Sequence, residues 1–256
     1  MGVSVPVLMY HHVLPQEGFI ASSITQFEAQ MRYLAETGWS TLDSDTFARY
    51  KQGELDIPKK SVMITFDDGW RDNFVYAYPI LKRYDLKATI FVVTEWIEKA
   101  SQKREIFEPL HHKACKQIIS EHPASVILSW NDLEAMRDVF EVHSHTHSHR
   151  DSYFEGSFRW EEEFELSKEL LETRLGIKTR HLCWPRGQYD DSLVNKACKS
   201  GLDILYTTKR GVNPPDCDTY AIKRIGAKKG ARWLAKNLAL FSHTLSGSLY
   251  AKLKPE

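Results

Sequence analysis

Residues 61–69 read Ser-Val-Met-Ile-Thr-Phe-Asp-Asp-Gly, an apolar run that ends in two carboxylates and a glycine. Residues 88–93, Ala-Thr-Ile-Phe-Val-Val, repeat the apolar run after a stretch of helical character around 79–84. Short continuous apolar runs of this kind are typical of strands that are buried on both faces of a parallel sheet. The stretch from 61 to 93 therefore predicts a β-α-β unit.

Strand and helix alternate on both sides of this unit. Before it, Thr25 and Glu28 have the spacing of a capping box, and apolar residues follow at helical spacing until Gly38. After it, strand-like runs recur near 139–142, 181–184, 203–207 and 221–225. The chain has 256 residues and no linker rich in Pro, Gly or Ser. We expect one α/β barrel domain, since such barrels commonly need roughly 200 to 250 residues.

Two segments depart from the alternation. Residues 95–125 are polar and charged, and we expect a helical insertion that covers one end of the sheet. Beyond a barrel predicted to span 1–226, residues 227–256 form a basic amphipathic tail. From residue 221 onward eight Lys and Arg side chains stand against Glu256 alone, with Leu, Phe, Trp and Tyr between them. This mixture suits the anionic face of a membrane, and a packed or oligomerising tail is the alternative.

Composition excludes several classes of protein. Lys plus Arg and Asp plus Glu number 34 each, so the chain lacks the basic field that a nucleic-acid binder needs. Its four cysteines contain no C-x-x-C pair, and we interpret them as reduced and mostly structural. No basic leader or apolar span opens the chain. We expect a cytoplasmic protein that contacts the inner membrane peripherally, and the alternative is an exported protein whose leader has been removed.

Asp67 and Asp68 stand where a buried parallel strand ends, which is the place of active-site groups in such barrels. Adjacent residues on an extended chain point in different directions, so the pair can serve one site only in different roles. One carboxylate could bind a metal and the other act as a base. The alternative is a helix N-cap followed by an acidic first turn.

A run of histidines follows another strand-like segment, in the stretch Glu-Val-His-Ser-His-Thr-His-Ser-His at 141–149. On one helical turn His145 and His149, at i and i+4, would converge on a single ion. With Asp68 they would make a three-ligand site that leaves room for water, as catalytic metals require. The alternative is an incidental histidine-rich surface loop.

These residues resemble a known family. The segments 65–69, 145–149 and 184–189 (Trp-Pro-Arg-Gly-Gln-Tyr) are similar, in order, to the motifs of the polysaccharide deacetylases, the NodB-homology or carbohydrate esterase 4 family. The opening 6–13 resembles the Y-H-x-V start of the subgroup that contains poly-N-acetylglucosamine deacetylases. The resemblance covers most of residues 5–225 and implies a distorted (β/α)7 barrel in a single domain.

The resemblance also implies roles. A divalent metal would be held by Asp68, His145 and His149, with Asp67 as the general base. We expect Zn²⁺, although Co²⁺, Ni²⁺, Mn²⁺ or Fe²⁺ suit the same ligands. The family's late L-x-H motif is not evident here, and the subgroup's pattern places His11 of the first strand in the acid role, ahead of its neighbour His12.

The third motif departs from the family's R-x-P-Y form, because Arg186 follows the proline. Arg186 is a candidate to hold Asp67 or to contact substrate, and its alternative is a surface charge on a turn. Trp184, Tyr189 and Trp70 are candidates for a platform that stacks on a sugar ring, and core packing is the alternative for each.

The predicted activity is metal-dependent hydrolysis of the N-acetyl group of an N-acetylhexosamine, with N-acetylglucosamine as the expected sugar. Because we expect a cytoplasmic protein at a membrane, a lipid-linked or lipopolysaccharide-type glycan is the predicted substrate. One alternative is an exported deacetylase of poly-N-acetylglucosamine or peptidoglycan. A second is a pseudoenzyme that binds a glycan without turnover, which the displaced Arg186 alone supports.

Overall fold

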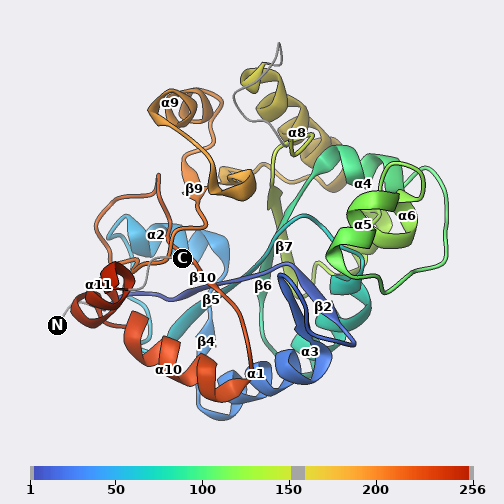
Figure 1. Cartoon of the computed structure of the whole chain (residues 1–256). Helices are drawn as coiled ribbons and strands as arrows, with labels where there is room; N and C mark the ends of the chain where they lie inside the picture. The colour runs from blue at the N-terminus through green and yellow to red at the C-terminus, as the bar shows by residue number, and fades with distance from the viewer. Residues whose placement is uncertain (1–2, 151–158, 254–256) are drawn as a thin grey trace.

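The computed structural model describes residues 3–150 and 159–253. One parallel sheet, in the order β10-β1-β5-β6-β7-β8-β9 with β4 paired to β5, curls into an open barrel (Figure 1). Its strands are β1 (Val7–Tyr10), β4 (Ser40–Thr41), β5 (Ser61–Phe66), β6 (Ala88–Val92), β7 (Phe140–Ser144), β8 (His181–Cys183), β9 (Ile204–Tyr206) and β10 (Ile225–Gly226). A separate pair joins β2 (His12–Leu14) to β3 (Ala21–Ser23). The predicted barrel of the NodB-homology type is confirmed.

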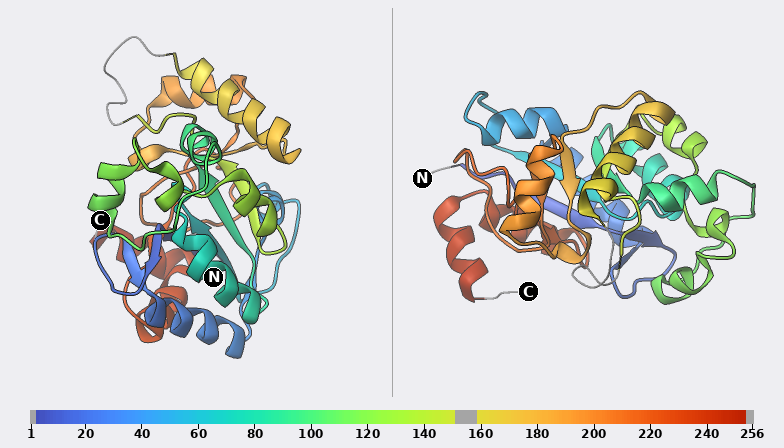
Figure 2. Two further views of the ribbon diagram at one scale, coloured as in Figure 1. Left: turned by 90° about the vertical axis from the view of Figure 1, so that its right-hand side faces the viewer. Right: turned by 90° about the horizontal axis from the view of Figure 1, so that it is seen from above.

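Helices surround this sheet in the order that the alternation predicts (Figure 2). They are α1 (Ile24–Glu36), α2 (Ser44–Lys51), η1 (Asn73–Ala77), α3 (Tyr78–Arg83), α7 (Trp130–Ala135), α8 (Trp160–Leu175), η2 (Pro185–Gly187), α9 (Asp191–Lys199), α10 (Ala231–Phe241) and α11 (Thr244–Leu253). The segment 95–125 contributes α4 (Thr94–Ala100), α5 (His112–Ile118) and α6 (Pro123–Val126). Figure 1 shows these three grouped beside the ends of β6 and β7.

The start of α1 differs from the prediction. Ser23, not Thr25, is the N-cap, and its hydroxyl accepts from the backbone N–H of Gln26 while the Gln26 side chain accepts from the Ser23 N–H. The capping box therefore begins two residues earlier, because β3 delivers Ser23 in the extended conformation that an N-cap needs.

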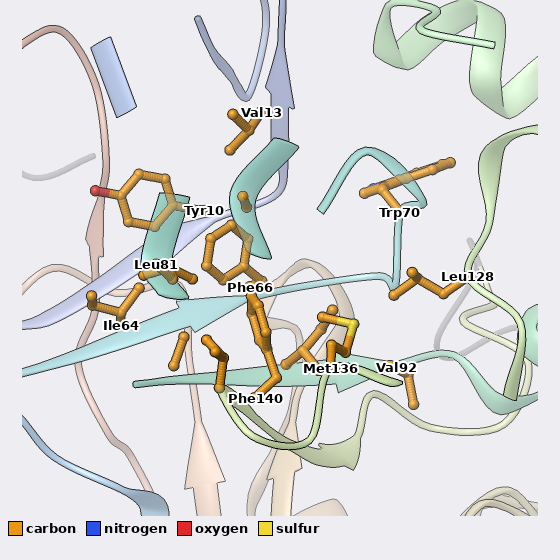
Figure 3. Packing of buried hydrophobic residues seen from close by; sticks show 14 of the residues in the cluster. Tyr10, Val13, Ile64, Phe66, Trp70, Leu81, Val92, Leu128, Met136 and Phe140 are labelled. Atoms are coloured by element: carbon orange, nitrogen blue, oxygen red, sulfur yellow. The ribbon is translucent and has the colours of Figure 1, made fainter. Parts of the chain in front are cut away.

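The main core lies between the sheet and its outer helices. Phe66 and Phe140 pack edge to face at the centre of this cluster, with their ring centroids 5.4 Å apart, and Tyr10 stacks on Phe66 (Figure 3). Each such aromatic side chain is fully buried or nearly so, which stabilises the fold by about 1.5–3 kcal/mol apiece. Tyr10 and Phe66 are the last residues of β1 and β5, so this packing holds the two strand ends beside which the site described below lies.

The boundary predicted at residue 226 does not hold. Leu234, Leu238 and Phe241 of α10 are buried in the main core, so the barrel includes this helix. The next helix, α11, carries an exposed apolar stripe, since Leu245, Leu249 and Leu253 are 73%, 62% and 71% exposed. Lys254 and Glu256 of the predicted tail lie outside the described residues. Within the described ranges, every helix is too short or too polar to cross a membrane.

Candidate active site

The two aspartates follow β5 directly, at the carboxyl end of the sheet. Both are buried, and the turn that separates them places Asp68 at φ 77° and Gly69 at φ 86°. Gly69 has little room for a side chain, because a Cβ there would lie 3.0 Å from Ile97 Cδ1 and 3.3 Å from Val92 Cγ1. The glycine thus lets the chain turn sharply against β6 and α4 and splay the two carboxylates.

Asp68 meets two histidines from the segment after β7. Asp68 Oδ1 lies 3.3 Å from His145 Nε2 and 3.4 Å from His149 Nε2, and all three side chains are largely buried. Zinc holds four ligands tetrahedrally at bonds of about 2.0–2.1 Å, a geometry that separates neighbouring ligand atoms by about 3.3–3.4 Å. The spacing of the three donor atoms, and their chemistry, therefore fit a divalent metal.

Surrounding groups orient these donors. The indole N–H of Trp70 donates to Asp68 Oδ2 at 2.8 Å, which leaves Oδ1 directed at the histidines. Because the Cys183 carbonyl oxygen can only accept, His145 Nδ1 carries the proton in their 2.8 Å hydrogen bond. The lone pair of His145 is thereby held on Nε2, the tautomer that a metal ligand needs. Burial raises the pKa of Asp68, but when His145 also carries a proton on Nε2, its hydrogen bond and the nearby histidines outweigh burial and hold that pKa well below its usual range. A bound metal takes the place of that proton.

The segment after β7 is an irregular loop, so the predicted helical turn is wrong. Thr146 at φ 67° and His149 at φ 46° adopt the left-handed conformation, which costs of order 1–3 kcal/mol for such residues. Glu163 of α8 offsets part of this strain by accepting from both the backbone N–H and the hydroxyl of Ser148, at 2.8 and 2.7 Å. The loop brings His145 and His149 together by its bends rather than by helical spacing.

A guanidinium that the sequence prediction missed holds Asp67. Arg224 Nη1 and Nη2 each donate to one oxygen of Asp67 at 2.7 Å, and both side chains are buried. Burial raises the pKa of Asp67, but the charge and hydrogen bonds of Arg224 outweigh it, so the net pKa lies below the usual value. The proposal that Arg186 holds Asp67 is wrong, because Arg186 is exposed in the turn after Pro185. In the sequence, Arg224 is one of the eight Lys and Arg residues from 221 onward.

Arg224 left a signal in the sequence. It sits in the apolar run 221–225, in which Ile222 and Ile225 are buried. An arginine is almost never fully buried unless it is paired with an acidic group. An arginine in a strand-like run therefore predicts a buried carboxylate partner. Asp67 is such a partner: it directly follows β5, which is separated from β10 by β1 in the same sheet.

His11 lies on the other side of Asp67. Its Nε2 is 3.8 Å from Asp67 Oδ2, and its side chain remains 18% exposed. Burial lowers the pKa of His11, against the opposing charge of Asp67. His11 lies between β1 and β2, and His12, the first residue of β2, points elsewhere and hydrogen-bonds Asp72 at 2.8 Å. Of the two, His11 is the one that the geometry places beside Asp67.

The predicted sugar platform is wrong at two of its three positions. Trp70 and Trp184 are fully buried, so neither can present a ring to a substrate. Trp70 instead orients Asp68, and Trp184 packs against Phe164 of α8. Tyr189 is half-buried, stacks on Trp184 with ring centroids 5.6 Å apart, and carries the Lys209 ammonium over its ring.

A second group of possible donors, Asp67, His145 and Cys183, also lies within reach of one point. It suits a cation less well, because Asp67 is already paired with the Arg224 charge. Burial also raises the pKa of the Cys183 thiol, which keeps it in the neutral form that binds metals poorly. We therefore assign the metal position to Asp68, His145 and His149.

Comparison of the chain with known proteins assigns it to a family. The sequence model of the polysaccharide deacetylases matches residues 54–205, more than half of the chain. The chain belongs to the polysaccharide deacetylase family. It is 28% identical over 225 residues to the polysaccharide deacetylase YxkH of Bacillus subtilis, covering 88% of this chain and 72% of that protein.

Two further comparisons agree. The poly-beta-1,6-N-acetyl-D-glucosamine N-deacetylase of Staphylococcus epidermidis is 25% identical over 201 residues, or 78% of this chain and 65% of that protein. The chain thus spans just under two thirds of that relative. The structure of the Streptococcus pyogenes deacetylase PplD in complex with acetate superposes with a TM-score of 0.78 over 95% of this chain and 100% of that one, at 23% identity. This likeness shows that the two share a fold.

Proposed function

We propose that this polysaccharide deacetylase family member hydrolyses the N-acetyl group of an N-acetylhexosamine in a glycan, with N-acetylglucosamine as the sugar. One observation carries the proposal. A carboxylate held ionised by Arg224 stands beside the three convergent donors of Asp68, His145 and His149, with the nearest Asp67 and His145 donor atoms within 4.8 Å. A base adjacent to a metal position is what hydrolysis of a poor electrophile such as an amide requires.

The residues divide the work as follows. A divalent cation held by Asp68, His145 and His149 would supply Lewis acidity to the acetyl carbonyl and to a water molecule. Asp67, fixed in orientation by Arg224, accepts the proton of the attacking water at the carboxylate oxygen nearer His11. His11 is placed to give a proton to the departing amine. Trp70 and the Cys183 carbonyl keep the donor atoms of Asp68 and His145 directed at one point.

The completeness of this arrangement argues against a pseudoenzyme. That alternative depended on the displaced Arg186, and Arg224 supplies the missing pairing with Asp67.

For the substrate we propose a lipid-linked or lipopolysaccharide-type glycan, supported by the exposed leucine stripe and basic bias of the C-terminal region. Poly-N-acetylglucosamine is the second candidate, because the Staphylococcus epidermidis relative is named for it.

We propose further that α11 contacts an anionic membrane surface. Leu245, Leu249 and Leu253 recur every four residues, which places them on one face of the helix, and all three are exposed. Exposed apolar residues aligned along a helix, in a region where Lys and Arg predominate, match the character of interfacial helices.

Acetate release tests the activity. Wild-type protein supplied with Zn²⁺ is compared with Asp67→Asn and Asp68→Ala on a lipopolysaccharide fraction, a lipid-linked glycan fraction and poly-N-acetylglucosamine oligomers. We expect acetate from wild type and its loss in both variants. Release from the oligomers alone would select the second candidate substrate, and no release from any of the three by a metal-loaded protein would refute deacetylation.

A further inference from the structure

A cavity of about 660 Å³ lies between the loop that follows β2 and the start of α5. Residues 14–19 line one side, and Pro109 with residues 111–113 line the other. Its volume falls within the roughly 300–1,000 Å³ of small-molecule sites in proteins. None of the residues assigned above to the base, the acid or the metal position belongs to it. We call this cavity the Phe19 pocket, after its exposed aromatic side chain.

The Phe19 pocket adjoins the active site through α5. His112 lines the pocket, and its ring centroid lies 5.6 Å from that of Trp70, the residue that orients Asp68. One helical turn further, the Lys116 ammonium lies 4.6 Å over the ring of Trp96. The face of α5 that carries His112 and Lys116 therefore rests on the two tryptophans that back the metal position, and the pocket opens beside that face.

A chain of hydrogen bonds orients the His112 ring. Asp72 accepts from the Val13 backbone N–H at 2.7 Å and from His12 Nδ1 at 2.8 Å, so His12 carries its proton on Nδ1. His12 Nε2 lies 3.1 Å from His112 Nδ1, within hydrogen-bonding distance. Burial, followed by the neighbouring His12, lowers the pKa of His112 to about 4, so the ring is neutral near pH 7. His112 Nε2 is left to hydrogen-bond a hydroxyl group, which can both donate and accept.

Phe19 supplies the complementary surface. Its side chain is 80% exposed, and its ring centroid lies 6.1 Å from that of His112. An aromatic ring next to a neutral imidazole nitrogen matches a pyranose, which offers an apolar C–H face for stacking and hydroxyl groups at its edge. The neutrality of His112 favours an uncharged sugar over an anionic group.

We propose that the Phe19 pocket binds a second, neutral pyranose ring of the glycan whose acyl group is removed at Asp67. The inference rests on the proposed deacetylase function and extends it from one sugar to at least two. The pocket then selects oligosaccharides over single sugars, because remote contacts add binding that a monosaccharide cannot use.

Binding of sugars to the Asp67→Asn protein tests the Phe19 pocket without turnover. The probes are N-acetylglucosamine and its β-1,6-linked tetramer, measured by calorimetry after thermal melting has shown each variant to be folded. We expect Phe19→Ala and His112→Ala each to weaken tetramer binding by about tenfold, the effect of one aromatic or hydrogen-bonding contact. Binding of the monomer should not change.

Two matched controls come from the same insertion. Ile106 is an exposed apolar side chain, and His122 is an exposed histidine paired with Glu105. Ile106→Ala and His122→Ala should leave tetramer binding unchanged. The proposal is overturned by a tetramer that binds no more tightly than the monomer, by equal losses for both probes in the pocket variants, or by equal losses in the controls.

Acetate release separates this proposal from the proposed function. Loss of tetramer binding in the pocket variants supports the Phe19 pocket even where wild-type protein releases no acetate from any glycan. If wild type releases acetate but the pocket variants bind the tetramer as wild type does, the deacetylase function is supported and the proposed role of the Phe19 pocket is refuted.

Discussion

Replacing Arg224 by methionine should destabilise the protein strongly and should do so in a pH-dependent manner. The guanidinium donates twice to Asp67 at 2.7 Å and once to the Thr207 carbonyl at 2.8 Å, and the pair is 0% and 2% exposed. Removal of one partner of a buried pair costs about 3–5 kcal/mol, because the other charge stays buried. Arg180→Met is the matched control: Arg180 also binds Asp203 through two hydrogen bonds, but is 55% exposed, so its loss should cost about 0–1 kcal/mol.

The pH dependence follows from the pKa of Asp67. In wild type that pKa lies below the ordinary value, so the pair stabilises the fold above about pH 3.9 and loses this effect as pH falls through the lowered pKa. Without Arg224, only the charges of His11 and His145 oppose burial, so we expect the pKa of Asp67 to rise. The deficit of Arg224→Met in the free energy of unfolding should therefore be largest at pH 7 and shrink toward acid. Urea denaturation from pH 4.5 to 7 measures it. A deficit equal to that of Arg180→Met, or one independent of pH, would refute the reasoning.

Three further outcomes are expected. Trp70→Phe keeps an aromatic ring but loses the indole hydrogen bond to Asp68. Zn²⁺ affinity, measured by competition with a chelator, should therefore fall about 10- to 100-fold. Unchanged affinity would count against the role of Trp70 in orienting Asp68. Burial and the stacked His181 lower the pKa of His143 well below its usual value. The free energy of unfolding should therefore fall by up to about 1.4 kcal/mol per pH unit as pH drops below about 6.5. The fall should be less steep in a folded His143→Gln variant. Glutamine at the three exposed leucines of α11 should abolish co-sedimentation with anionic liposomes without altering thermal stability, and retained binding would remove the membrane proposal.

The sequence predicted the parts of the molecule that repeat a simple pattern. The apolar run at 61–66 is β5, and the run at 88–93 contains all of β6, because strands buried on both faces must be apolar throughout. The pairing of Asp68 with His145 and His149 rested on side-chain chemistry and motif order, and the structure brings these donors together. The helical turn failed because left-handed residues in a loop leave no periodic signal.

The errors share a physical cause: burial is decided by partners far away in the chain. Arg224 looked like one of several surface cations, yet it lies 157 residues from the carboxylate that neutralises it. Trp70 looked like an exposed platform beside an acidic turn, and it became buried under the 95–125 insertion. The hydrogen bond between His12 and His112 spans 100 residues and depends on the conformation of that insertion.

The position of α11 has a consequence for the kind of glycan that the enzyme can use. Figure 1 and the second view of Figure 2 place α11 beside the N-terminus, where the strands begin, and α5 at the opposite end, where they finish. The backbone hydrogen bond from Ser4 to Ser242 anchors the junction of α10 and α11 to that starting end. A protein resting on a bilayer through α11 would stand upright, with its active site facing the aqueous phase. It would then deacetylate sugars near the distal end of a long lipid-linked glycan, and would not act on sugars next to the lipid headgroup.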